Sequence, residues 1–534
     1  MPDMQNNPLI TGLLRPGAYD HPTETIRLVE THCAWVLLTG EFAYKVKKPV
    51  DFGFLDFSTL EKRRHYCAEE IRLNQRFAPR IYLDVVAIGG SPGEPRVGAP
   101  GPALEYAVRM RQFADDGLLS QLAARHCLQS SHIDQLIDII GAFHQGAERA
   151  PSDSVYGDPG HVHHWVRENF EHIGRSLRSP TEIDRLEHIR QWSESERTRL
   201  TATLQARKRD GFVRECHGDL HLGNITLIDD RVTPFDCIEF NPELRWIDVI
   251  SEVAFLMMDL DDRGYKPFAF RFLNGYLQFG GDYAGLQVLR YYLVYRALVR
   301  AKVAMLRRTQ ADRESDDFRE AGDEYRQYAQ LAQQYLAPAA TALIITHGLS
   351  GSGKSTVARG LCEQARMIQI RSDVERKRLA GMAATDRSHS ATGEGLYTQD
   401  QTTGTYRELA RLAILVLQAG YPVIVDATFL QRAQREQFRD LAQTCEVPFI
   451  ILDCTATDAE LERRILVRAT AGRDPSEAGL DVLRAQREAC EPLDAQELAH
   501  TLRVDTQAAD LEKLHTAIDR LRRSQVKYDS RQQP

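Results

Sequence analysis

The chain has 534 residues, 43% hydrophobic and 27% charged, which exceeds one small domain and predicts about two to four folding units. Lys and Arg number 67 against 75 Asp and Glu, a formal charge of −8 without a long basic run, so nucleic acid is not an expected partner. Nine cysteines without a C-x-x-C pair indicate neither a disulfide framework nor a zinc site. Without a signal-peptide pattern or an apolar stretch of about eighteen residues, we expect a soluble, cytoplasmic protein with no membrane partner.

The first part of the chain, from about residue 26 to 113, is rich in strand-forming residues. Two short runs on either side of Thr39-Gly40-Glu41 predict a hairpin, and a helix follows. A loop rich in Gly and Pro then separates two further strands and reads as an exposed hairpin tip. The expected elements are strands at 32–38 and 42–47, a helix at 59–77, strands at 81–88 and 106–110, and the loop at 89–102.

The middle of the chain is mostly helical. Apolar residues recur at three- and four-residue spacing over 115–205 and 245–335, and a strand-like segment at 212–240 lies between these two regions. The charged segment at the end of the second region predicts a helix that Pro338 terminates, so we place a domain boundary at 336–341.

The last third alternates short apolar runs with helical segments. This alternation predicts parallel strands joined by helices, which is a doubly wound α/β sheet. The expected strands are 342–346, 367–370, 423–425 and 449–452.

A G-x-x-x-x-G-K-S motif follows the first of these strands and precedes a helix at 356–364. Its glycines let backbone N–H groups surround a phosphate, Lys354 reaches the β and γ oxygens of ATP, and the Ser355 hydroxyl is a Mg²⁺ ligand. The alternative is an ordinary Gly/Ser turn. The predicted ATP-binding residues are Gly348, Ser350, Gly351, Ser352, Gly353, Lys354, Ser355 and Thr356.

A carboxylate ends the apolar strand at 423–425. Asp426 has the position of a Walker B residue that holds Mg²⁺, although a strand-ending Asp can also cap a helix. Ala427-Thr428 follows in place of a Glu, which argues against a motor ATPase and favours transfer to a substrate hydroxyl.

Two further features favour a small kinase. Asp373 follows the second strand and is a candidate base for the acceptor hydroxyl, or else the N-cap of a helix at 374–380. Arg464 and Arg468 share one helical face and, with Arg473, predict a lid over the phosphates, although helical arginines are often only solvated. Residues 342–520 resemble the P-loop small-molecule kinases, which include gluconate and shikimate kinases, polynucleotide kinase and zeta-type toxins.

A second phosphotransfer motif lies in the strand-like segment at 212–240. The sequence runs His217-Gly-Asp219-Leu-His221-Leu-Gly-Asn224, and Asp236 ends the next predicted strand. Phosphoryl transfer needs one carboxylate near the acceptor hydroxyl, and an amide and a second carboxylate on Mg²⁺, which this set supplies. Two histidines among carboxylates are also compatible with a transition-metal site, although magnesium fits the oxygen ligands better.

This motif resembles the aminoglycoside phosphotransferase branch of the kinase-like fold, which also includes choline and homoserine kinases. The resemblance implies that Asp219 is the catalytic base, that Asn224 and Asp236 bind Mg²⁺, and that His217 fixes the loop. Acidic residues downstream are either acceptor-binding groups or solvated side chains: Asp248, Asp259, Asp261 and Asp262.

Kinases of this kind anchor ATP with a strand lysine that pairs with a helix glutamate. Lys45 and Lys47 share one face of the strand at 42–47, and Glu69 and Glu70 lie in the following helix. We predict the pair Lys45 and Glu70, the alternative being a solvated lysine on an edge strand. No G-x-G-x-x-G loop precedes this lysine, a feature that aminoglycoside phosphotransferase relatives also lack.

Taken together, the segment at 47–63, the His-Gly-Asp loop and the P-loop resemble the bifunctional aminoglycoside phosphotransferase/ATP-binding protein family. The fold implied is an α+β bilobal protein-kinase-like domain, followed by an α/β P-loop NTPase domain with a parallel sheet. The predicted limits are 1–335 for the first domain, with lobes at about 20–110 and 111–335, and 342–525 for the second.

These motifs predict a bifunctional phosphotransferase that uses ATP and Mg²⁺ to phosphorylate hydroxyl groups of small, sugar-like or aminoglycoside-like metabolites. Two alternatives remain open, a regulatory sensor in which one domain controls the other and a toxin-like kinase of nucleotide sugars. The sequence makes no prediction of oligomeric state.

Overall fold

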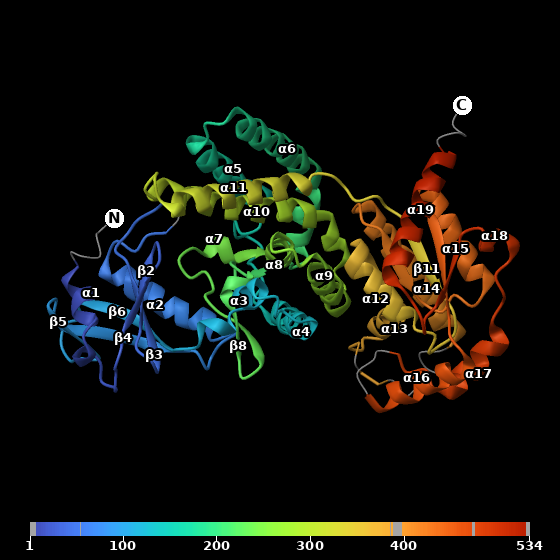
Figure 1. Cartoon of the computed structure of the whole chain (residues 1–534), viewed down its shortest axis with the longest axis horizontal. Helices are drawn as coiled ribbons and strands as arrows, with labels where there is room; N and C mark the ends of the chain where they lie inside the picture. The colour runs from blue at the N-terminus through green and yellow to red at the C-terminus, as the bar shows by residue number, and fades with distance from the viewer. Residues whose placement is uncertain (1–6, 54, 385, 388–397, 472–475, 530–534) are drawn as a thin grey trace. The chain divides into compact units, whose positions relative to one another are not determined.

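A computed structural model of the chain describes residues 7–53, 55–384, 386–387, 398–471 and 476–529. The chain divides into two compact units, and Figure 1 shows the whole chain coloured from the N-terminus to the C-terminus. Unit 1 comprises residues 1–135, 146–165 and 204–259, and unit 2 comprises residues 136–145, 166–203 and 260–534. This division does not test the predicted domain limits, which stay predictions.

Unit 1 contains a six-stranded antiparallel sheet in the order β1-β2-β3-β6-β4-β5. Its strands are β1 (Arg27–Glu30), β2 (Ala34–Leu38), β3 (Phe42–Lys47), β4 (Tyr82–Ser91), β5 (Glu94–Val97) and β6 (Glu105–Arg111). The predicted loop at 89–102 therefore contains a strand. Ile88 pairs with Val97, which is buried in the same core as Leu13 of helix α1 (Pro8–Leu13), and this burial stabilises the additional hairpin.

Helix α2 (Leu60–Asn74) packs against β4 and β6. Its N-cap Thr59 accepts a hydrogen bond from the backbone N–H of Lys62, which satisfies a free donor of the first turn. One helical face buries Glu70 together with apolar side chains. This face places a carboxylate against the sheet, as the predicted pairing with a strand lysine requires.

The predicted strand-like segment forms two short antiparallel pairs. Strand β7 (Val213–Glu215) pairs with β10 (Trp246–Asp248), and β8 (Ile225–Ile228) pairs with β9 (Arg231–Pro234). The helices that precede and follow these strands in the chain are α3 (Leu119–Ala124), α4 (Ser130–Gly146), α5 (Pro159–Ser176), α6 (Pro180–Arg209), α7 (Pro242–Arg245) and α8 (Val249–Asp262). This arrangement leaves the motif loop between β7 and β8.

Unit 2 contains a five-stranded parallel sheet in the order β12-β13-β11-β14-β15. Its strands are β11 (Leu343–His347), β12 (Ile368–Arg371), β13 (Val423–Asp426), β14 (Phe449–Thr455) and β15 (Thr501–Asp505). The predicted parallel α/β fold is confirmed, and the sequence missed only the fifth strand, β15. Every residue of the central strand β11 is buried, because helices cover both faces of the sheet.

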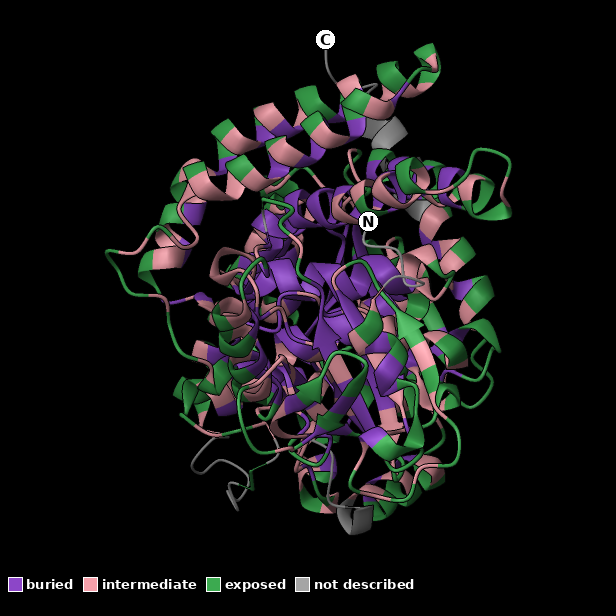
Figure 2. Cartoon of the chain, turned by 90° about the vertical axis from the view of Figure 1, so that its left-hand side faces the viewer, coloured by how far each residue is buried: buried purple, intermediate pink, exposed green. Residues whose placement is uncertain are grey.

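The helices of unit 2 carry apolar faces toward this sheet or toward one another. Those around the sheet are α12 (Lys354–Ala365), α13 (Ser372–Leu379), α14 (Gln399–Gln418), α15 (Arg432–Thr444), α16 (Asp458–Ala471), α17 (Leu480–Ala489), α18 (Ala495–Leu498) and α19 (Leu511–Asp529). Before them in the chain come α9 (Lys266–Gly280), α10 (Leu286–Gln310) and α11 (Asp316–Gln334), of which α10 and α11 pack together. In Figure 2, many strands are buried, whereas the helices have buried residues on one side and exposed residues on the other.

None of the helices in the described ranges is both long and apolar enough to cross a membrane.

Candidate functional sites

The structure brings three predicted site residues of unit 1 together. The Nζ atom of Lys45 on β3 lies 2.8 Å from Glu70 Oε1 on α2 and 2.6 Å from Asp236 Oδ1. Burial alone would lower the pKa of the Lys45 ammonium, but Asp236 and Glu70 hold that pKa well above its usual value. Lys45 is therefore a fixed positive charge beside a candidate metal carboxylate.

Lys47 joins the same cluster. Its Nζ lies 2.6 Å from Glu70 Oε2 and also contacts the carboxylate of Glu239. Although burial raises the pKa of Glu70, Lys45 and Lys47 lower it to about 2, so Glu70 is the shared anion of both lysines. Only Lys45 of the two has an ion pair with Asp236, which favours it as the ATP-anchoring residue. The sequence missed Glu239, which follows Asp236 at a spacing of three residues.

Asp219 and Asn224 lie in one loop and face each other. The amide nitrogen of Asn224 donates to the backbone oxygen of Asp219 at 3.0 Å and to its Oδ2 at 2.9 Å. This contact leaves Asn224 Oδ1 as the atom of that side chain with which to bind a cation. Asp236 does not end strand β9, as predicted, but lies two residues beyond its last residue, Pro234.

The departure of Asp236 from the strand has a backbone cause. Its φ is +65°, a left-handed conformation that is unfavourable for a residue with a side chain and is typical of functional sites. Its N–H donates to the Tyr82 hydroxyl at 3.1 Å, which satisfies a donor that a strand would have paired. The turn directs the carboxylate toward Lys45.

His217 fixes this loop through both of its ring nitrogens. Nε2 lies 2.8 Å from the backbone oxygen of Phe235, and the N–H of Asp219 donates to Nδ1 at 3.3 Å. The hydrogen bonds assign a neutral ring that is protonated on Nε2, and burial lowers the pKa of His217, which favours this form. Since both ring nitrogens form hydrogen bonds with backbone groups, neither is available to bind a transition metal.

Two carboxylates of α8 also hold the motif loop. Glu252 accepts hydrogen bonds from the backbone N–H groups of His217 at 3.1 Å and Gly218 at 2.7 Å, and buried Asp259 accepts from Leu222 at 2.8 Å. Asp259 therefore positions the loop rather than binding an acceptor. The sequence reasoning missed Glu252, one of four acidic residues in the otherwise apolar helix α8.

In unit 2, the P-loop links β11 to the first residue of α12. Gly351 has φ +83°, and a Cβ atom there would lie 2.7 Å from the backbone oxygen of Leu461. Gly353, with φ +84°, is the N-cap of α12, which therefore starts at Lys354. Only glycine adopts this loop without strain, and the loop presents backbone N–H groups at a helix N-terminus, the usual site for phosphate.

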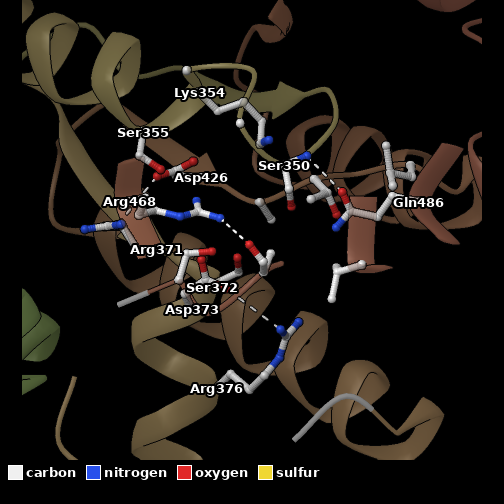
Figure 3. Close-up of a pocket in the computed structure, with 18 of the residues that line it drawn as sticks. Ser350, Lys354, Ser355, Arg371, Ser372, Asp373, Arg376, Asp426, Arg468 and Gln486 are labelled. Carbon is white, nitrogen blue, oxygen red and sulfur yellow. Dashed lines mark hydrogen bonds and ion pairs between the residues drawn. The ribbon is translucent and has the colours of Figure 1, made fainter. Parts of the chain in front are cut away.

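A cavity of about 660 Å³ opens beside this loop, and Figure 3 shows its polar lining. Arg371, Arg376, Arg463 and Gln486 are lining residues that the sequence reasoning missed. The predicted residues among its lining are Ser350, Gly351, Gly353, Lys354, Ser355, Thr356, Asp373, Asp426, Arg464 and Arg468. Gly348 and Ser352, the other two predicted loop residues, are not part of that lining and belong to the body of the loop.

The loop lysine folds over the P-loop. Lys354 Nζ donates to the backbone oxygen of Leu349 at 2.7 Å, and burial lowers the pKa of this ammonium, although nearby Asp426 acts in the opposite direction. When a phosphate enters the loop, its charged oxygens would replace the neutral Leu349 oxygen as the hydrogen-bond acceptors of Lys354.

Asp426 and Ser355 fit a magnesium ion. A hydrogen bond joins the Ser355 hydroxyl to the Asp426 carboxylate, and Arg371 Nε lies 3.7 Å from Asp426 Oδ2. Burial raises the pKa of Asp426 against the opposing effects of Arg371 and Ser355. A hydroxyl and a carboxylate are the hard oxygen donors that Mg²⁺ prefers, and Asp236 and Asn224 Oδ1 supply the same chemistry in unit 1.

Asp373 lies within the first turn of α13, whose N-cap is Arg371. The alternative prediction, in which Asp373 caps a helix at 374–380, is therefore wrong. The helix begins earlier and the carboxylate lines the cavity, where Arg376 Nη1 lies 3.8 Å from Asp373 Oδ1.

The two predicted lid arginines are held by protein contacts. Arg464 donates to Thr506 Oγ1 at 2.8 Å and to Glu460 Oε1 at 2.6 Å, and Arg468 donates to the backbone oxygen of Ala478 at 2.7 Å. Both line the cavity, so they are more than solvated charges. Arg473 lies outside the described residues.

Gln486 of α17 contacts the P-loop directly. Its Oε1 accepts a hydrogen bond from the backbone N–H of Ser350 at 2.8 Å. No sequence motif marks this residue, because the contact joins residues 136 positions apart in the chain.

The two folds and these residue sets define the class of the protein. It joins a kinase-like fold and a P-loop fold in one chain. A family model described as AAA domain matches residues 343–493. The chain is similar to "Uncharacterized protein Rv2004c" of Mycobacterium tuberculosis and "Uncharacterized protein Mb2027c" of Mycobacterium bovis, each 33% identical over 458 residues, or 85% of this chain and 88% of the relative. The chain belongs to the family of these mycobacterial proteins.

Solved structures with similarity to the chain cover one or the other part. A choline/ethanolamine kinase family protein from Mesorhizobium loti is 10% identical, with a TM-score of 0.38, over 62% of this chain and 99% of that chain. A gluconokinase from Sinorhizobium meliloti 1021 is 22% identical, with a TM-score of 0.26, over 36% of this chain and 99% of that chain.

Proposed function

We propose that the protein is a bifunctional phosphotransferase that uses ATP and Mg²⁺ to phosphorylate hydroxyl groups of two small metabolites, one at each site. The observation that carries this proposal is the cavity of about 660 Å³ in unit 2. The phosphate-binding loop and the Asp373 carboxylate line the same cavity, so a phosphate donor and a proton acceptor share one space.

At the P-loop site, the backbone N–H groups of the loop and Lys354 bind the β and γ phosphates. Ser355 and Asp426 would hold Mg²⁺, which neutralises charge on the phosphate oxygens when bound. Asp373 accepts the proton of the attacking hydroxyl, while Arg464 and Arg468 stabilise the charge on the transferred group.

At the kinase-like site, Lys45 takes the place of the loop as the phosphate-binding group, oriented by Glu70. Asn224 and Asp236 would hold Mg²⁺ there. The Asp219 carboxylate, held by the Asn224 amide, accepts the proton of the second acceptor.

The charge of the cavity in unit 2 narrows the class of its acceptor. Its arginines outnumber its carboxylates: Arg371, Arg376, Arg463, Arg464 and Arg468 against Asp373 and Asp426. We expect a neutral or anionic hydroxylated metabolite at this site, since a polycationic aminoglycoside would be repelled.

The test is transfer of label from γ-labelled ATP to a deproteinised cell extract by the full-length protein. We expect labelled small molecules in the presence of Mg²⁺ and none in EDTA. Folded protein that labels no component of the extract, while hydrolysing or binding ATP, would contradict the proposed activity and favour a regulatory sensor.

A further inference from the structure

Helix α9 packs along β12 and the P-loop helix α12 within unit 2 (Figure 1). Strand β12 is at the edge of the parallel sheet, and the backbone N–H of Ile368 pairs with Pro422 on the side of β13. On the opposite side, the amide of Asn274 in α9 donates to the backbone oxygen of Met367 at 3.0 Å and accepts from the N–H of Gln369 at 2.7 Å. Asn274 thus provides both hydrogen bonds that a neighbouring strand would supply to an edge strand.

The side chain of Gln369 continues this contact to the metal site. Its Nε2 donates to Asp426 Oδ2 at 3.0 Å, and its Oε1 accepts from Gln278 of α9 at 3.5 Å. Gln369 is 2% exposed and Asp426 is 4% exposed, so water does not compete for these hydrogen bonds. A chain of hydrogen bonds therefore joins α9 to the carboxylate of the P-loop site.

We propose that Asn274 and Gln369 are positioning residues that orient Asp426 for Mg²⁺. Helix α9 then contributes to metal binding at the P-loop site. This inference rests on the proposed use of Mg²⁺ at that site. A carboxylate rotates readily about its last torsion, and a hydrogen bond to one oxygen fixes the direction of the other. Groups that orient a metal ligand in this way commonly change metal affinity by about 10- to 100-fold when they are removed.

This role has a consequence for the organisation of the chain. The predicted kinase-like domain ends at residue 335 and would include α9. If α9 orients Asp426, the P-loop part depends on a helix that precedes its own first strand, and any event that shifts α9 changes the metal site.

The experiment measures binding of a fluorescent ATP analogue to full-length protein in EDTA and in saturating Mg²⁺. All variants carry Asp236→Asn, which removes a metal carboxylate of the other site. Gln369→Met keeps the volume of the side chain but loses both hydrogen bonds. We expect about tenfold weaker binding in Mg²⁺ and unchanged binding in EDTA. Asn274→Leu changes binding in the same direction.

Arg271→Gln is the matched control. Arg271 Nη1 lies 2.8 Å from Glu363 Oε1, so this variant removes another contact between α9 and α12. We expect its Mg²⁺-dependent binding and its thermal unfolding to equal those of the parent protein.

The inference is overturned if Gln369→Met binds the analogue as the parent does in Mg²⁺, or if it weakens binding equally in EDTA. It is also overturned if the parent protein shows no gain in affinity from Mg²⁺. A parent protein that gains affinity from Mg²⁺ but phosphorylates no metabolite contradicts only the proposed function, because this binding assay requires no turnover.

Discussion

The two proposed nucleotide sites obtain their positive charge in different ways. In unit 1, the ammonium groups of Lys45 and Lys47 supply it, and Glu70 holds both of them from another element. In unit 2, a contiguous loop presents backbone N–H groups at the N-terminus of α12, and its glycines adopt left-handed conformations. The first site depends on buried ion pairs between distant segments, whereas the second depends on local backbone geometry. The two sites should therefore respond to different substitutions.

The largest expected effect is on the ion-pair cluster of unit 1. Glu70→Gln leaves the buried Lys47 ammonium and the half-buried Lys45 ammonium without their shared carboxylate, which should destabilise unit 1 by about 3–5 kcal/mol. Hydrogen exchange of the β3 and α2 amides measures this loss, and the amides of the parallel sheet in unit 2 should keep their protection.

Glu69→Gln is the control for this substitution. Glu69 pairs with partly exposed Arg72 and, at 3.4 Å, with Arg245, which keeps Glu215 as a second partner, so the loss of Glu69 should cost about 1 kcal/mol. Equal loss of protection in Glu70→Gln and Glu69→Gln would contradict the account of the cluster.

The same cluster predicts that the stability of unit 1 depends on pH. The pKa of Glu70 is lowered to about 2 in the folded protein, so its contribution to stability is fully present above its ordinary pKa of 4.5 and is lost as the pH falls toward 2. Wild-type protection of β3 should therefore fall over that range, and Glu70→Gln should flatten the dependence. A Glu70→Gln variant with an unchanged pH profile would show that Glu70 is not the titrating group.

A smaller effect is expected from backbone strain in the P-loop. Gly351→Ala places a Cβ against the backbone oxygen of Leu461 at a positive φ, which should cost about 2 kcal/mol and weaken ATP binding to unit 2 about tenfold or more. Gly479→Ala is the control, since its φ is −90° and no heavy atom lies within 4 Å of the added Cβ. Unchanged ATP affinity in Gly351→Ala, measured by calorimetry, would contradict the assigned loop geometry.

The smallest effect concerns Gln486. Because its oxygen accepts from Ser350 N–H, Gln486→Glu would place a negative charge at the phosphate-binding loop and raise the KM for ATP about fivefold to tenfold. Gln486→Ala adds no charge and should change the KM by less than about threefold. Steady-state kinetics in which both variants match the wild type would show that α17 does not approach the phosphates.

The sequence predicted a site well where its residues are contiguous, and less well where distant segments form it. The P-loop, its strand and its helix are contiguous, so residue order alone located them, apart from a helix that begins at Lys354 instead of residue 356. The Lys45, Glu70 and Asp236 cluster required knowledge of a motif, because Lys45 and Asp236 are 191 residues apart.

Three of the residues that the sequence did not reveal act through other residues. Glu252, Gln369 and Gln486 bind backbone groups or a neighbouring carboxylate, and their positions depend on packing between elements. The sequence showed that Asp373 follows the second strand of the parallel sheet. Whether Asp373 caps a helix or lines a cavity depended on where α13 begins.

The most direct test of the central claim, two independent phosphotransfer sites in one chain, is product analysis with one variant for each site. Asp219→Asn removes the proposed base of unit 1, and Lys354→Met removes the phosphate-binding lysine of unit 2, each at an expected cost of about 10²–10³-fold in its own reaction. With γ-labelled ATP and a metabolite extract, each variant should lose a different labelled product and retain the other. Loss of the same product in both variants would contradict two independent sites and would show that one site controls the other.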